Sequence, residues 1–187
     1  RETDSYSEMK WKTQMATTLG TFQSTLTNFK YLRKIWQRNT EEERLLGVSL
    51  TGIMDSNVRG WTATQLDCLK HVAVRENEKL AAELGIPQST AITCVKPSGT
   101  VSQLVNSSSG IHARHSPYYI RTVRQDNKDP MTEFMKDQNF PNEPCVSKPN
   151  DTTIFSFPIK APEGAVTRNE MTAIEQLELW LKFKTHW

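Results

Sequence analysis

The sequence predicts an α/β fold with a largely parallel or mixed sheet. Stretches with helical apolar spacing alternate with short runs of β-branched residues, as in strands that are joined by helices. The length of 187 residues corresponds to one globular domain or to a large piece of one. Because no linker or internal repeat divides the sequence, we predict that residues 1–187 form a single unit without separate domains.

The first predicted element is a helix. Met15, Leu19, Phe22, Leu26 and Phe29 recur at spacings of four and three, which places them on one helical face. We expect this face to pack in the core. A glycine and several threonines lower the intrinsic helix propensity of the stretch, so tertiary packing must support it.

Four strands and further helices follow in alternation. Strands are predicted at 45–54, 91–95, 118–124 and 152–159, where β-branched and aromatic residues gather. Helices are predicted at 65–84, 131–136 and 169–187, and another begins after Gly99. Gly85 and Pro87 end the helix at 65–84. The proline-rich segment 140–151 is predicted to be a loop.

The charge and cysteine content argues against several classes of protein. Lysine and arginine number 23 against 21 aspartates and glutamates, and this net charge of +2 is too balanced for a polybasic nucleic-acid or membrane binder. No apolar run is long enough to cross a bilayer. Three widely spaced cysteines and a polar N-terminus indicate a reducing, cytoplasmic location.

The stretch 30–38 mixes basic and aromatic residues, a combination that can bind nucleic acid by charge and stacking. The acidic run 41–43 follows at once and cancels the field. We therefore favour a solvated helix face with Leu32, Ile35 and Trp36 packed inward, and we predict no nucleic-acid partner.

The two ends of the sequence lack the features of natural termini. The chain begins with Arg1, and its last residues, 175–187, keep a helical apolar pattern without Gly, Asn or Pro to end it. We expect the sequence to be an internal fragment of a longer protein.

Residues 96–102 carry the most informative chemical pattern. A predicted strand is followed by Pro97, which fixes a turn, by Gly99, which removes a side chain, and by the start of a helix. The first N–H groups of a helix lack internal partners and lie at the positive end of its dipole, so they bind anions. Further donors come from four side chains, those of Lys96, Ser98, Thr100 and Ser102. The run predicts a phosphate-binding loop, although an ordinary turn with a helix cap has the same composition.

Other constellations in the sequence are weaker. The spacing of a Walker loop is absent. His112 and His115 could ligate zinc, but no further ligand stands at a diagnostic spacing, and we predict no metal site. Arg121 and Arg124 lie on opposite faces of a strand, so at most one of them points into a given site. Neither paired carboxylates nor a nucleophile triad is recognisable.

Two segments form a more specific pattern when they are taken together. They are Thr93–Ser102, with the sequence TCVKPSGTVS, and 110–124, which contains GIH and YYIRTVR. The flanking segments 46–53 and 155–160 add to the pattern in the same order along the chain. The whole resembles the adenosylcobalamin-dependent (class II) ribonucleotide reductases, and above all their ribonucleoside-triphosphate reductase branch.

This resemblance implies part of the C-terminal half of a ten-stranded α/β barrel, incomplete in this chain. It implies an enzyme of deoxyribonucleotide biosynthesis that replaces the ribose 2′-hydroxyl of ribonucleotides, triphosphates in this branch, by hydrogen. Homolysis of the cobalt–carbon bond of adenosylcobalamin would start the radical, and a thioredoxin-like dithiol would be the reductant. The family's phosphate-binding role falls on Pro97, Ser98, Gly99, Thr100, Val101 and Ser102.

Several motifs of the family are not found in this sequence. They are the radical cysteine of the finger loop, the Asn-x-Cys-x-Glu constellation and the redox pair of cysteines. Cys68, Cys94 and Cys145 stand in other contexts, so no catalytic residue is assigned, and we expect the segment alone to be inactive. The alternative is a stand-alone, non-catalytic nucleotide-binding α/β module.

Overall fold

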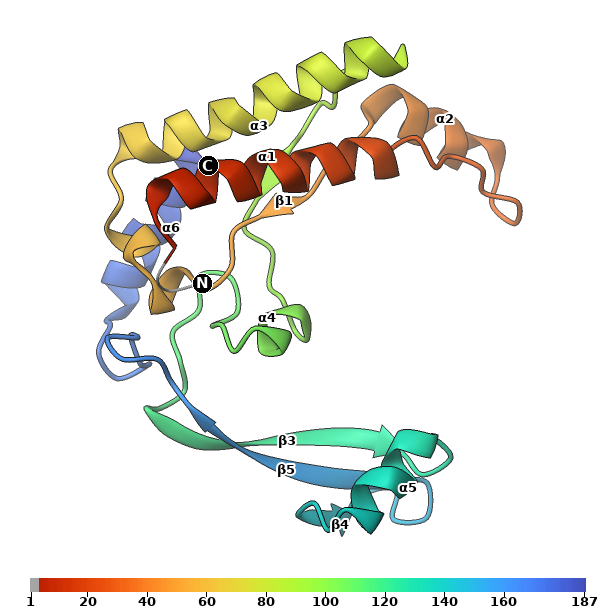
Figure 1. Ribbon diagram of the computed structural model, residues 1–187, viewed down its shortest axis with the longest axis vertical. Helices are drawn as coiled ribbons and strands as arrows, with labels where there is room; N and C mark the ends of the chain where they lie inside the picture. The colour runs from red at the N-terminus through yellow and green to blue at the C-terminus, as the bar shows by residue number, and fades with distance from the viewer. Residues whose placement is uncertain (1–3) are drawn as a thin grey trace. The chain divides into compact units, whose positions relative to one another are not determined.

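A computed structural model describes residues 4–187, which form two compact units. We call residues 4–114 together with Glu163–Trp187 unit 1, and His115–Pro162 unit 2. The labels of the elements are those of Figure 1.

Unit 1 combines helices with two short parallel strands. Its elements are α1 (Tyr6–Gln23), α2 (Lys34–Glu43), β1 (Val48–Ser49), the 3-10 helices η1 (Ile53–Asp55) and η2 (Asn57–Gly60), α3 (Ala63–Leu84), β2 (Thr93–Cys94), α4 (Val101–Leu104) and α6 (Ala173–His186). β1 pairs with β2 in parallel, with Val48 opposite Thr93. The strands predicted at 45–54 and 91–95 are therefore present but shorter, because the chain turns away after each of them.

The core of unit 1 gathers side chains from β1, η1, α3 and α6 and from residues next to the two strands. They include Val48, Leu50, Ile53, Met54, Leu66, Leu69, Ala73, Ile92, Leu179 and Phe183. α3 buries the face that the sequence predicts, except that Leu84 at its end is exposed. A capping box of Thr62 and Gln65 starts this helix, and Gly85, at φ +67°, ends it.

α1 packs along α3, but not through the predicted apolar stripe (Figure 1). Its buried residues are Thr13, Thr17 and Thr21, whereas Leu19 is 72% exposed, and Met15 and Phe22 are exposed too. Leu26 and Phe29, the other two residues of the stripe, lie beyond the end of α1 at Gln23. The prediction of a core-facing stripe is thus wrong. Threonines are small enough to let two helices approach closely, and the hydroxyls of Thr17 and Thr21 each donate to the carbonyl four residues earlier.

The basic, aromatic stretch lies before and within α2, which buries none of its residues. Leu32, Ile35 and Trp36 are exposed, so the prediction that they pack inward is wrong. Among residues 4–187, no helix combines the length and the apolar character that a membrane span requires.

A polar cluster joins α1 and α3 inside unit 1. Asn77 of α3 is 1% exposed, and its Nδ2 donates to the hydroxyls of Thr21 (2.9 Å) and Ser89 (3.0 Å). Its Oδ1 accepts the backbone N–H of Ser89 at 2.9 Å. The Asn77 amide thus gives the buried hydroxyls of Thr21 and Ser89 and the Ser89 N–H a partner, whereas the Thr17 hydroxyl is satisfied within α1.

Unit 2 is a three-stranded antiparallel sheet with one helix. Its elements are β3 (Tyr118–Asp126), α5 (Pro130–Asp137), β4 (Asn142–Pro144) and β5 (Thr152–Lys160), and the strand order is β3-β5-β4. The long strands β3 and β5 pair along their whole length, from Tyr118 opposite Lys160 to Asp126 opposite Thr152.

The sequence predicts three of the four elements of unit 2. β4 lies in the segment predicted as a loop, because a three-residue, fully exposed edge strand that ends in proline has no strand signature. The predicted α/β class is confirmed. In place of one largely parallel or mixed sheet, the described residues form a parallel pair in unit 1 and an antiparallel sheet in unit 2.

We expect Asn77→Leu to lower the free energy of unfolding by about 1–3 kcal/mol, since the buried N–H of Ser89 loses its acceptor. Chemical denaturation of the purified protein measures this change. Asn39→Leu on the exposed surface of α2 is the matched control, with an expected change within about 0.5 kcal/mol. Equal losses in the two variants would contradict the role of the cluster.

Candidate functional site

The predicted phosphate loop, residues 96–102, follows β2 and lies beside the chain that leaves β1. The carboxyl ends of parallel strands meet at one edge of a sheet, which is where ligands bind in α/β folds. The helix predicted after the loop is α4, and it has only four residues. Its dipole is correspondingly small, so hydroxyls and loop N–H groups must supply most of any anion binding here.

The side chains of the loop have distinct surroundings. Ser102 is buried, and its hydroxyl donates to the carbonyl of Ser98 at 2.7 Å, so it braces the loop from within. Thr100 is exposed, and its side chain makes no capping bond to α4. Gly99 is exposed, and no atom lies within 4 Å of the position that a Cβ would take. The outer side of the loop is thus open at Gly99.

A returning segment, residues 106–110, holds the loop from the other side. The Ser98 N–H donates to the hydroxyl of Ser109 at 2.9 Å. Gly110 has a φ of +55°, and a Cβ on it would stand 3.0 Å from the carbonyl oxygen of Lys96. Only glycine allows this close approach at this backbone conformation.

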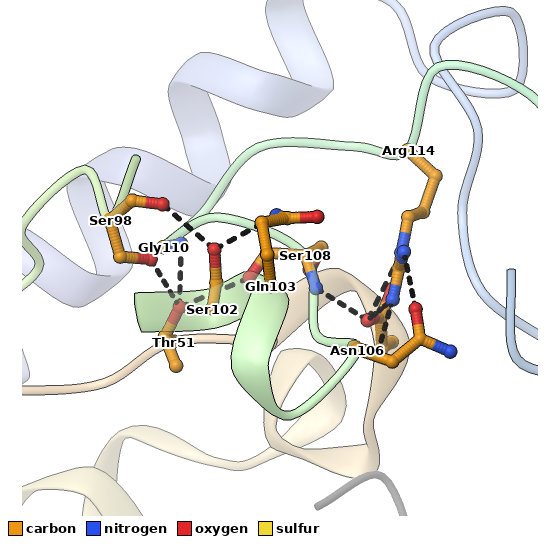
Figure 2. A network of polar contacts seen from close by, with 9 residues as sticks. Thr51, Ser98, Ser102, Gln103, Asn106, Ser108, Gly110 and Arg114 are labelled. Carbon is orange, nitrogen blue, oxygen red and sulfur yellow. Dashed lines mark hydrogen bonds and ion pairs between the residues drawn. The ribbon is translucent and has the colours of Figure 1, made fainter. Parts of the chain in front are cut away.

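Thr51 joins the exit of β1 to both of these segments (Figure 2). Its Oγ1 lies 3.0 Å from the hydroxyl of Ser98, donates to the Ser108 carbonyl at 3.0 Å and accepts the Gly110 N–H at 2.9 Å. The next residue, Gly52, has a φ of +70°, and its own N–H donates to the same Ser108 carbonyl at 2.9 Å. One hydroxyl thus contacts the phosphate loop at one residue and the returning segment at two.

A buried ion pair fixes the base of the returning segment. The side chains of Asp55 and Arg114 are 3% and 2% exposed, and Nη2 of Arg114 lies 2.7 Å from Oδ2 of Asp55. Nε of the same guanidinium donates to both carboxylate oxygens, at 3.0 and 3.2 Å. The carboxylate also accepts the Ser108 N–H at 2.6 Å, and Nη2 donates to the Asn106 carbonyl at 2.6 Å. Because buried charges are costly unless they are hydrogen-bonded, this set of bonds makes the pair tenable.

The backbone of Arg114 links the pair to the last part of unit 1. Its N–H donates to the Val166 carbonyl, and its carbonyl accepts the Arg168 N–H, both at 2.8 Å. The sequence analysis missed Thr51, Asp55 and Arg114 as site residues. The available signal was an acidic residue directly after a buried apolar run, and that signal does not identify the partner.

His112 and His115, the two histidines considered as zinc ligands, belong to different units. His112 is exposed in unit 1, and His115 lies in unit 2, where its ring meets that of Tyr119 edge to face. Within the part of the chain that the structure describes, no group of three or more His, Cys, Asp or Glu side chains is placed to hold a metal ion.

Cys145 of unit 2 is a buried free thiol that the sequence analysis left without a role. A hydrogen bond from the Ser147 hydroxyl, at 3.4 Å, and backbone N–H groups of Ser147 and Lys148 lower the pKa of this thiol to about 7. A thiolate is therefore substantially populated at neutral pH. The main contacts that lower the pKa come from the turn after β4, and the Arg124 side chain of β3 adds a smaller one.

A cleft of about 690 Å³ lies beside β2 and α6 in unit 1. Apolar side chains dominate its wall, among them Val74, Ile92, Trp180, Phe183 and Trp187. No residue of 96–102 lines it, so this cleft is separate from the phosphate loop.

Comparisons with known proteins bear on this site. A reductase of Euglena gracilis, named adenosylcobalamin-dependent ribonucleoside-triphosphate reductase, is 30% identical in an alignment of 162 positions that covers 81% of this chain. The protein of the same name from Levilactobacillus brevis is 25% identical and covers 96% of this chain. No protein-family profile matches the sequence.

A solved structure shares the fold. The crystal structure of a B12-dependent (class II) ribonucleotide reductase superposes with a TM-score of 0.76 over 94% of this chain, at 23% identity. The chain spans 22% of the Euglena protein, 28% of the Levilactobacillus protein and 29% of the crystallised chain. The resemblance in the sequence is thus confirmed, and it is a resemblance to one segment of these reductases.

Replacing Asp55 by Asn should lower the free energy of unfolding by about 3–5 kcal/mol, since the charge of Arg114 is then buried without a counter-charge. Thermal and denaturant unfolding of the variant measure the loss. Glu83→Gln breaks the exposed Lys79–Glu83 pair instead and should change stability by less than about 1 kcal/mol. A variant at Asp55 as stable as this control would contradict the structural role of the buried pair.

We expect the Cys145 thiol to ionise with a midpoint near pH 7. The measurement is the ultraviolet absorbance of the thiolate as a function of pH, taken as the difference between the natural protein and a Cys145→Ser variant. Because the pKa is lower in the folded state than in the unfolded state, the thiolate adds stability above pH 7, and this contribution is lost as the pH falls through 7. Ser147→Ala should move the midpoint up toward the ordinary thiol value of about 8.5. A midpoint that does not respond to Ser147→Ala would disprove the assigned cause.

Proposed function

Because this chain is homologous to one segment of the adenosylcobalamin-dependent ribonucleoside-triphosphate reductases, we propose that it provides the substrate-phosphate loop of such an enzyme. The observation that carries the proposal is the loop at 96–102, which stands at the carboxyl end of a parallel strand and is open at Gly99. Its residues Pro97, Ser98, Gly99, Thr100, Val101 and Ser102 form the proposed site.

The loop offers an anion several donors of different kinds. The Thr100 hydroxyl is exposed, and the Ser98 hydroxyl is half-buried at the rim. At the start of α4 the Gln103 N–H donates to the Thr100 carbonyl at 2.9 Å, so the N–H groups of Val101 and Ser102 are the ones proposed to bind the anion. Lys96, exposed at the end of β2, adds a positive charge. Since Gly99 has no side chain, phosphate oxygens can approach the backbone of the loop directly.

In the whole protein this binding would align the substrate for chemistry elsewhere. The proposed reaction replaces the 2′-hydroxyl of a ribonucleoside triphosphate by hydrogen. Held phosphates fix the position of the ribose, and such positioning makes the reacting groups effectively neighbours. In this proposal the segment binds and orients, and the reacting cysteines belong to other parts of a longer polypeptide.

Adenosylcobalamin, which the names of the relatives contain, would supply the initiating radical through its cobalt–carbon bond. The residues described here do not form a recognisable site for it. We therefore assign no cofactor contact to this chain and derive no step through the cofactor.

The remaining partners follow from the proposed activity. A dithiol protein of the thioredoxin type would restore the oxidised cysteines, and the enzyme would work in the cytoplasm without a nucleic-acid or membrane partner. The alternative is a free-standing nucleotide-binding module. The relatives, of which this chain spans less than a third, favour the segment of a reductase.

Gly99→Val in the full-length protein should raise the KM for ribonucleoside triphosphates at least tenfold, because the new side chain fills the space above the loop. Steady-state assays with adenosylcobalamin and a dithiol measure this constant. The change in kcat should be smaller, since the altered group binds the substrate at a distance from the ribose.

Gly60→Val is the matched control for this substitution. Gly60 also has an open Cβ position and an ordinary φ, but it lies in η2. Its KM should stay within about twofold of the natural protein, an interval that corresponds to about 0.4 kcal/mol. An unchanged KM in the Gly99 variant would refute the role of the loop.

A further inference from the structure

The hydrogen bonds of Thr51 have a direction that follows from its partners. A hydroxyl has one proton to donate and two lone pairs to accept with. The Gly110 N–H can only donate, and the Ser108 carbonyl can only accept. The third neighbour, the Ser98 hydroxyl at 3.0 Å, can do either.

Thr51 therefore accepts from Gly110 and has one proton left to place. It can donate this proton to the Ser108 carbonyl or to the Ser98 hydroxyl. The carbonyl keeps a partner in both cases, since the Gly52 N–H donates to it at 2.9 Å. Turning the Thr51 proton toward Ser98 thus leaves no buried acceptor without a bond.

The position of the Thr51 proton decides whether the Ser98 hydroxyl can donate a hydrogen bond to a ligand or can only accept one. When Thr51 donates to the carbonyl, the Ser98 proton points at Thr51, and the Ser98 oxygen presents only lone pairs outward. When Thr51 donates to Ser98, the Ser98 proton is released to point at an anion. A phosphate favours the second placement, because a hydrogen bond to a charged acceptor is stronger than one to a neutral hydroxyl.

We propose that Thr51 is a positioning residue of the phosphate loop, which turns the Ser98 hydroxyl into a donor to the substrate's phosphates. The chain of donors runs from the Gly110 N–H through Thr51 to Ser98 (Figure 2). In the proposal, the Ser98 hydroxyl then donates to the anion. Each bond in such a chain polarises the next, so the last donor gains strength. The inference rests on the proposed function and adds a residue that lies outside residues 96–102.

The surroundings keep Thr51 in place for this task. Gly52 and Gly110, which flank its contacts, both have positive φ values. A Cβ on Gly52 would stand 2.1 Å from the Ser107 hydroxyl, and one on Gly110 would press on the Lys96 carbonyl. The returning segment is held in turn by Asp55 through the Ser108 N–H. The two backbone partners of Thr51, the Ser108 carbonyl and the Gly110 N–H, are thus held in fixed positions.

The test compares Thr51→Val, which has nearly the same shape but no hydroxyl, with Thr51→Ser in the full-length protein. Inorganic tripolyphosphate serves as the probe, as a competitor of the ribonucleoside triphosphate. We expect the valine variant to raise the inhibition constant and the KM about tenfold with a smaller change in kcat. The serine variant should stay within about threefold, an interval of about 0.7 kcal/mol.

Thr90→Val is the matched control. Its hydroxyl also donates to a backbone carbonyl, that of Glu43 at 3.2 Å, but it precedes β2 instead of following it. The melting temperatures of the three variants report on folding. A Thr51→Ser variant as impaired as Thr51→Val would overturn the proposal, because the hydroxyl would then not be the active group.

A double-mutant cycle separates an action through Ser98 from a general loosening of the loop. If Thr51 acts through Ser98, then Thr51→Val should change the inhibition constant less than twofold once Ser98 is alanine. A full tenfold change in that background would refute the inference. If Gly99→Val impairs binding and Thr51→Val does not, this inference fails and the proposed function stands. If Gly99→Val has no effect, the proposed function itself fails.

Discussion

The buried ion pair between Asp55 and Arg114 is the interaction on which the candidate site depends. Its two side chains are almost fully removed from water and are separated by 59 positions in sequence. Removing two charges from water is costly, and the cost is offset here because the carboxylate and the guanidinium are both surrounded by partners. Through the N–H of Ser108 and the carbonyl of Asn106, the pair sets the position of the returning segment. The phosphate loop is hydrogen-bonded to that segment, because the Ser98 N–H donates to the Ser109 hydroxyl.

The loop itself is built from hydroxyls and backbone contacts more than from a helix. α4 has a single turn, so the strength of the site must come from groups that are held in place by their neighbours. Ser102 fixes the loop from within, and Thr51 fixes it from the exit of β1. Such rigid placement suits a site whose task is to orient a flexible triphosphate, since the loop backbone and the oxygens of Thr51 and Ser98 are held in position before the ligand arrives, and only their protons must turn.

The sequence predicted the elements better than it predicted their faces. α3, β3 and β5 were predictable because each has an unbroken periodic pattern with clear stop signals. The prediction for α1 chose the wrong face. Leu19 and Phe22 have the apolar spacing of a buried helix face, whereas the face that is buried consists of threonines, which an apolar pattern does not reveal. The loop at 96–102 was predicted from local chemistry and from the resemblance. Asp55 and Arg114 were not, since burial of a charge depends on a partner that only the folded chain brings near.

The ion pair also constrains how this segment can evolve. Loss of either charge alone leaves the other buried and uncompensated, whereas apolar residues of similar volume at both positions can be as stable as the pair. A lineage that carries Asp55 and Arg114 therefore has an accessible alternative but no viable single step toward it. We therefore expect Asp55 and Arg114 to be conserved together. In any homologue in which one of them is replaced, we expect the other to be replaced as well. A charge pair can thus persist through the difficulty of replacing it one residue at a time, even where it is not the most stable solution.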